Sequence, residues 1–114
     1  MSNLAVGQTG ETIAREYLEK QGYQIIETNK RFSRFCEIDI IAKNKDVYVF
    51  CEVKTRTANL CGSPFEAITK TKYENIKKGI YLYKQENPDC KKYRIDAIAI
   101  TLKPELKIEH LKNI

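Results

Sequence analysis

The sequence predicts an α/β fold of a single domain, in which helices pack against one sheet in the order α-β-β-β-α-β-β. Three observations support this prediction. Apolar residues recur at helical spacing near the N-terminus, three runs rich in β-formers follow, and a strong helix start signal separates these runs from further strand-like segments. At 114 residues the chain has room for one domain, residues 1–114, that can bury its own core.

The first helix is predicted from about residue 8 to residue 21, where the apolar residues are spaced for one buried face. Thr9 is expected to cap its start, and Gly22 to end it in a left-handed conformation. Tyr23 to Thr28 alternates and is rich in β-formers, so it is predicted to be the first strand. The basic, aromatic segment that follows, Asn29 to Phe35, is predicted to be a loop.

Two further strands, Glu37 to Lys43 and Val47 to Thr55, are predicted to pair as an antiparallel hairpin. Asn44 and Lys45 are expected at the centre of the tight connection between them. The second strand of this pair is apolar on both faces until Glu52, which is typical of a central strand that is covered on both sides.

The second helix has the clearest start signal in the chain. Ser63 is a cap residue, Pro64 takes the first helical position, and Glu66 stands three residues after the cap. The apolar stripe is weak at residues 69–71, where a break or bend is expected, and Asn87-Pro88 ends the helix. Two strand-like runs complete the order: Tyr93 to Leu102 and Leu106 to Leu111.

The predicted hairpin register places charged side chains on one face. With the turn at Asn44-Lys45, Asp39 lies opposite Phe50 and Glu37 lies opposite Glu52, and Lys54 shares their face. A one-residue slip would mix charges into the other face, so the pattern supports the register. The residues of that other face are all apolar: Ile38, Ile40, Ala42, Val47, Val49, Cys51 and Val53.

The charged face is the candidate site. A solvated face with cross-strand ion pairs is the alternative, and such faces are common. Three carboxylates at the end of a covered strand repel one another, however, and are costly to bury unless they are paired or bound to a metal. We therefore expect Glu37, Asp39 and Glu52 to bind a hard divalent cation, Mg²⁺ or Mn²⁺, that promotes phosphodiester hydrolysis. Lys54 would stabilise the developing phosphate charge or orient the attacking water.

The spacing of an acid two residues before a lysine is weak evidence by itself. Three such pairs occur in the chain, beginning at Glu52, Asp89 and Glu105. Only the pair at Glu52 lies in a long apolar strand with an acid on a paired strand, so the context selects it.

The composition indicates the partner and the compartment. A net charge of +5 favours a polyanion, most commonly nucleic acid, although solubility alone would also explain it. The four cysteines lack metal-site spacing, and no signal peptide or membrane span is recognisable, so we expect a cytoplasmic protein with free thiols and no membrane partner. Phe32 and Phe35 are expected to pack rather than to stack on bases. The basic residues expected to contact phosphates are Lys30, Arg31, Arg34, Arg56, Lys70, Lys72, Lys77 and Lys78. The lysines among them are equally well explained as plain solvated surface.

Five motifs extend over nearly the whole chain: Gly7 to Ala14, Cys36 to Ala42, Phe50 to Arg56, Gly62 to Ile68 and Arg94 to Ile100. Together they resemble the YraN-like family of small bacterial proteins in the restriction-endonuclease-like superfamily. The resemblance implies a single nuclease-like domain with a PD-(D/E)xK-type core and a mixed central sheet, similar to archaeal Holliday-junction resolvases. By position, it implies that Asp39 and Glu52 are metal ligands, that Lys54 is the catalytic lysine, and that Glu11 reaches the site from the first helix.

Two functions follow from this resemblance. The first is a metal-dependent DNA endonuclease acting on structured or branched DNA, for which a homodimer is suggested by analogy alone. The second is a module that binds nucleic acid or a protein partner through a weak or inactive nuclease site, because a fold implies ancestry more firmly than activity. The family usually has glycine where this chain has Cys36, so we expect strain if that position has a positive φ. His110 is expected to be a packing histidine rather than a catalytic base.

Overall fold

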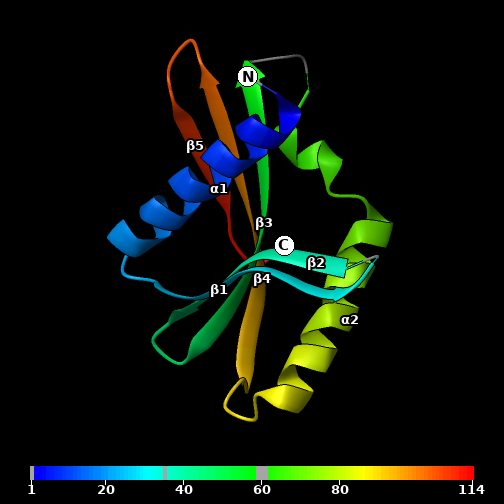
Figure 1. Cartoon of the computed structure of the whole chain (residues 1–114). Helices are drawn as coiled ribbons and strands as arrows, with labels where there is room; N and C mark the ends of the chain where they lie inside the picture. The colour runs from blue at the N-terminus through cyan, green and yellow to red at the C-terminus, as the bar shows by residue number, and fades with distance from the viewer. Residues whose placement is uncertain (1, 35, 59–61) are drawn as a thin grey trace.

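The computed structural model of the chain describes residues 2–34, 36–58 and 62–114. Within these residues, five strands form one sheet in the order β1-β2-β3-β4-β5, with a long helix on each face (Figure 1). β3 and β4 are parallel and the other neighbours are antiparallel, so the sheet is mixed. The predicted α/β class and element order are confirmed. The elements are α1 (Asn3–Lys20), β1 (Gln24–Ser33), β2 (Cys36–Asn44), β3 (Val47–Ala58), η1 (Pro64–Ala67), α2 (Lys70–Glu86), β4 (Lys92–Lys103) and β5 (Lys107–Leu111).

The first helix begins earlier than predicted. The Ser2 side chain accepts the N–H of Ala5 at 3.1 Å, so Ser2 is the cap, and Thr9 lies inside the helix. The predicted end is confirmed, because Gly22 has φ of 91° directly after the C-cap. No helix in the described part of the chain is both long enough and apolar enough to cross a membrane.

The segment predicted to be a loop is largely strand. β1 continues to Ser33, with Asn29 at φ of 52° and a register shift between Arg31 and Ser33. β1 lies at the edge of the sheet, where charged residues and bulges are tolerated, and this explains why a polar segment remains paired. Phe32 packs against the core beneath α2, as expected, and Phe35 lies outside the described residues.

The register of the β2–β3 hairpin differs from the prediction by two residues. Asn44 pairs with Val47 and Ile40 pairs with Cys51, so Lys45 and Asp46 form the turn, with Lys45 at φ of 57°. A shift of two residues does not by itself change the face on which a side chain lies, because faces alternate with a period of two. Glu37, Asp39 and Glu52 line one hollow, so the three predicted carboxylates are brought together.

Two apolar cores cover the sheet, one under each helix, so β3 is covered on both faces as predicted. The core beneath α1 includes Leu18, Ile40 and Cys51, and the core beneath α2 includes Ile38 and Phe50. Ile38 was predicted to share a face with Ile40, but the two pack on opposite sides of the sheet. β2 therefore turns over at the residue between them, Asp39.

The second helical region is divided where the sequence indicated a break. Ser63 accepts the N–H of Phe65 at 3.2 Å and caps η1, a short 3₁₀ helix. Thr69 then accepts the N–H of Lys72 at 3.1 Å and caps α2, which ends at Asn87. The start signal at Ser63 therefore belongs to η1, and a second cap sets the direction of α2.

Candidate functional site

The site forms where β2 separates from β3. Backbone pairing of these strands ends at Ile40 and Cys51, while β3 continues to Ala58 alongside β4. Asp39 Oδ2 accepts the N–H of Val53 at 2.8 Å. The side chain thus takes the place of the backbone carbonyl that β2 no longer supplies, and this bond fixes the carboxylate at the opening between the strands.

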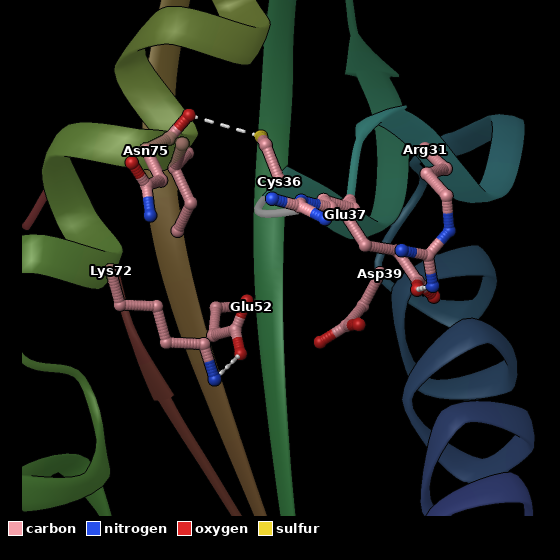
Figure 2. A pocket seen from close by; sticks show the side chains of 9 residues that line it. Arg31, Cys36, Glu37, Asp39, Glu52, Lys72 and Asn75 are labelled. Atoms are coloured by element: carbon pink, nitrogen blue, oxygen red, sulfur yellow. Dashed lines mark hydrogen bonds and ion pairs between the residues drawn. The ribbon is translucent and has the colours of Figure 1, made fainter.

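Glu52 lies at the same opening and is buried. Its carboxylate forms an ion pair with the ammonium of Lys72, which comes from the first turn of α2 (Figure 2). The Glu52 side chain is 5% exposed, whereas the Lys72 side chain is 46% exposed. The buried carboxylate of Glu52 is therefore neutralised by the ammonium of a lysine side chain that is partly exposed to solvent.

The predicted catalytic set is brought together around one hollow of about 510 Å³. Glu11, Asp39, Glu52 and Lys54 all line it, from α1, β2 and β3, and Lys72 does so from α2. The resemblance placed Glu11 here, and the structure agrees with that placement.

Gly10 explains how α1 approaches the site. A Cβ atom on Gly10 would lie 1.6 Å from Thr55 Oγ1, so only glycine permits this contact between α1 and β3. Glu11 follows directly in the helix. Nothing in the local sequence around Gly10 indicates this role, because it depends on a contact with a strand residue 45 positions later.

A second hollow of about 320 Å³ lies beside the first, and Asp39, Glu52 and Lys72 line both. Its other polar side chains are those of Arg31, Arg34, Glu37 and Asn75 (Figure 2). Arg31 Nη2 donates to Glu37 Oε2 at 2.8 Å. Glu37 is therefore at the site, but its carboxylate is held by an arginine.

The electrostatics favour an added cation. Burial raises the pKa of Asp39 to about 7, with a further increase from Glu52 and Glu11, while the Val53 N–H and Lys72 oppose it. Burial also raises the pKa of Glu52, and Lys72 opposes this effect. Two neighbouring carboxyl groups whose pKa values are both raised form a cluster that is short of positive charge.

The donor chemistry fits Mg²⁺ or Mn²⁺ held by few protein ligands. Among the described residues, no group of three or more His, Cys, Asp and Glu side chains is arranged to hold a metal ion. Asp39 and Glu52 alone fit a hard cation, because Mg²⁺ commonly takes one or two carboxylates and completes its shell with water and phosphate. Glu11 and Glu37 lie farther out in the same cluster and raise the pKa of Glu52 by charge repulsion.

The basic residues predicted to contact phosphates divide into two groups. Arg31, Arg34 and Lys72 line the hollow beside the acids. The other five lie elsewhere. Arg56 donates to Thr101 Oγ1 and to the Gly62 carbonyl, at 3.3 Å each. Lys70 lines an apolar hollow at the start of α2, and Lys30 forms an ion pair with Glu27 at 3.7 Å. Lys77 and Lys78 are exposed on α2 and line neither hollow of the site.

His110 has partners that its local sequence did not reveal. Its Nε2 lies 2.7 Å from Asp96 Oδ2 and its Nδ1 lies 2.9 Å from the Tyr17 hydroxyl. Arg94 Nε and the Asn113 N–H also donate to Asp96, each at 3.0 Å. Burial raises the pKa of Asp96, but these hydrogen bonds together hold it below its usual range. The network joins β4, β5 and α1 away from both hollows of the site, as expected of a structural histidine.

Cys36 lies in a strand, so the condition under which strain was expected, a positive φ, is not met. It begins β2, is not among the described residues with positive φ, and its Sγ donates to the Asn75 carbonyl at 3.0 Å. The space above Gly79 accommodates it, since a Cβ there would lie 2.7 Å from Cys36 Sγ. Cys36, Cys51 and Cys90 are free thiols, as predicted, and Cys61 lies outside the described residues.

Fold and site together define a small α/β protein with a pair of buried carboxylates at the point where two strands of a mixed sheet separate. The model of the uncharacterised protein family UPF0102 matches residues 10–100 of the chain. A UPF0102 protein of Syntrophus aciditrophicus (strain SB) is 43% identical over 97% of this chain and 88% of the relative. Another, from Natranaerobius thermophilus, is 41% identical over 99% of this chain and 98% of the relative. The chain belongs to the UPF0102 family, which is the YraN-like family that its motifs resemble.

Among solved structures, the chain is similar to Pyrococcus furiosus SfsA in complex with Ca²⁺. The TM-score is 0.38 and the sequence identity is 14%. The match covers 97% of this chain and 64% of the SfsA chain, so this chain spans less than two thirds of that structure.

Proposed function

We propose that this protein is a divalent-metal-dependent nuclease acting on DNA, and that Asp39 and Glu52 hold Mg²⁺ or Mn²⁺. One observation supports this most strongly. Two buried carboxylates with raised pKa values meet at an opening in the sheet, and lysines from two different elements reach the same opening. A purely structural ion pair does not need the second carboxylate there, and that carboxylate costs stability.

Each residue has a defined task in this proposal. When bound, the metal ion would polarise the scissile phosphodiester and activate water. The Val53 N–H holds one oxygen of Asp39 and leaves the other for the ion. Lys54 lies two residues after Glu52 in β3 and lines the same hollow. It would bind a phosphate oxygen or orient the attacking water. Glu11 would hold water at the edge of the hollow.

DNA is the proposed substrate because the chain is basic and the acidic site is bordered by Arg31 and Arg34. The preference for structured or branched DNA rests on the sequence resemblance, as does a homodimer that would supply a second site for the second strand. The proposed location is the cytoplasm, where the free thiols would remain reduced.

The test is a panel of single-stranded, duplex, flapped and four-way DNA incubated with Mn²⁺. We expect the wild type to cleave at least one substrate, and the Asp39→Asn/Glu52→Gln double variant to cleave none. Calorimetric titration with Mn²⁺ should give heat with the wild type and none with the double variant. Equal heats, or equal cleavage, would remove these carboxylates from the function.

A DNA-binding module with an inactive site is the second candidate. Two observations favour it: Glu52 already has Lys72 as a counter-ion, and no three-ligand group is present among the described residues. Binding of the DNA panel without cleavage in Mn²⁺ would select this candidate.

A further inference from the structure

We propose that Lys72 is an exchangeable counter-cation that neutralises the carboxylate pair until a divalent ion arrives and then binds a phosphate of the substrate. This inference rests on the proposed function, because it requires that Asp39 and Glu52 bind a metal. It goes beyond that function by coupling metal binding to DNA binding through one side chain.

The two partners of the Glu52–Lys72 ion pair differ in solvent exposure, and this difference favours replacement of the lysine by a metal ion. Glu52 is fixed on a central strand and is 5% exposed, whereas the Lys72 side chain is 46% exposed at the start of α2. Leaving the pair returns the ammonium to water at little cost, while the carboxylate cannot follow it. A divalent ion can therefore replace the lysine without unfolding any part of the site.

The position of Lys72 suits both states. Its backbone is anchored, because Thr69 Oγ1 accepts its N–H at 3.1 Å, so only the side chain needs to move. It also lines both hollows, the one with Glu11 and Lys54 and the one with Arg31. A released ammonium thus remains beside the basic side chains proposed to hold DNA.

Lys72 serves both acids and not Glu52 alone. Asp39, Glu52 and Lys72 line both hollows together, so the ammonium lies beside both carboxyl groups. Removing the ammonium should therefore leave two like charges without compensation in the metal-free protein.

The first measurement is Mn²⁺ affinity by calorimetry for the wild type, Lys72→Met and Lys78→Met. Lys78 is the matched control, since it is exposed on the same helix and forms no ion pair among the described residues. We expect Lys72→Met to bind Mn²⁺ about three- to tenfold more tightly than the wild type, because no ammonium has to be displaced from a half-exposed pair. Lys78→Met should match the wild type.

The second measurement is DNA affinity by fluorescence anisotropy, with EDTA and with Ca²⁺. Ca²⁺ should increase the DNA affinity of the wild type and of Lys78→Met by a larger factor than that of Lys72→Met, since the variant has no ammonium to release. Lys72→Arg keeps a cation and should restore most of the wild-type coupling.

The outcomes separate this inference from the proposed function. If the wild type binds no Mn²⁺, the proposed function fails. If the wild type binds Mn²⁺ but Lys72→Met binds it equally or more weakly, the metal site stands and the exchange role of Lys72 is wrong. If Ca²⁺ increases DNA affinity by the same factor in all variants, the coupling is wrong.

Discussion

The carboxylate of Asp39 accepts the backbone N–H of Val53 at 2.8 Å, one step beyond the last backbone pair between β2 and β3. This bond lets two strands separate without leaving a buried donor unpaired. It also fixes a carboxylate beside Glu52, where burial and charge repulsion work against it. The negative charge of Asp39 therefore lowers the stability of the metal-free protein, although the same carboxylate is the proposed metal ligand. This cost can be measured as a free energy of unfolding.

Asparagine at position 39 should make the metal-free protein more stable. Asp39→Asn keeps an oxygen for the Val53 N–H and removes a charge that is unfavourable next to Glu52. At pH 8 in EDTA we expect the free energy of unfolding in urea to rise by about 1 to 3 kcal/mol. The same variant should lose Mn²⁺ binding. A variant less stable than the wild type would contradict the uncompensated charge.

The stability of the metal-free protein should fall as pH rises through neutrality. The pKa of Asp39 is about 7 in the folded chain and 3.8 as its ordinary value, so between these values the folded state holds a proton that the unfolded state lacks. The free energy of unfolding should therefore decrease from about pH 5 to about pH 8. Asp96 acts in the opposite direction but only in acid, since its lowered pKa gives stability that is lost below its ordinary value of 3.8.

Urea unfolding in EDTA at several pH values tests this slope. The Asp39→Asn variant is the control, and its curve should be flatter in the same window. A wild-type curve that is flat or rises between pH 5 and pH 8 would show that Asp39 ionises as an ordinary carboxyl group.

Alanine at position 10 should disturb both the fold and the site. Its Cβ would lie 1.6 Å from Thr55 Oγ1, so α1 would have to move away from β3, and Glu11 with it. We expect Gly10→Ala to lower the free energy of unfolding by about 1 to 3 kcal/mol. Thermal denaturation of the double variant Gly10→Ala/Thr55→Gly should recover most of this loss. Strictly additive effects would show that the two residues do not meet.

The buried network around Asp96 should affect stability and leave the metal site intact. Asp96→Ala removes the carboxylate that Arg94 and His110 contact and leaves both side chains without their anionic partner. We therefore expect the free energy of unfolding to fall by about 3 to 5 kcal/mol. Mn²⁺ affinity of the folded variant should remain that of the wild type. A loss of metal binding in a folded Asp96→Ala protein would mean that the two clusters are coupled.

The sequence determined the faces of the strands more reliably than their register. The sequence prediction places the turn at Asn44-Lys45, one residue early, whereas Lys45 and Asp46 form it and Lys45 has a positive φ. The resulting error of two residues did not by itself move any side chain to the other face, since alternation repeats every two residues. What failed was the side of Ile38, because local alternation does not reveal where a strand turns over.

Long-range partners account for most of what the sequence could not predict. Lys72 was grouped with other surface lysines, and only the placement of α2 brings it to Glu52. His110 had no visible partner, because Asp96 lies on the neighbouring strand β4. Glu11 was placed correctly through a family resemblance, which supplies tertiary information that spacing within one chain does not contain.

Because β2 turns over at Asp39, the residues on either side of Asp39 pack on opposite faces of the sheet. Ile38 packs in the core beneath α2 and Ile40 in the core beneath α1, so Asp39 lies between residues of the two apolar cores. A core side chain can therefore influence the site without touching it, because packed cores transmit strain. Substitutions deep in either core should shift the same carboxylate, so the geometry of the site depends on the packing of both faces of the sheet.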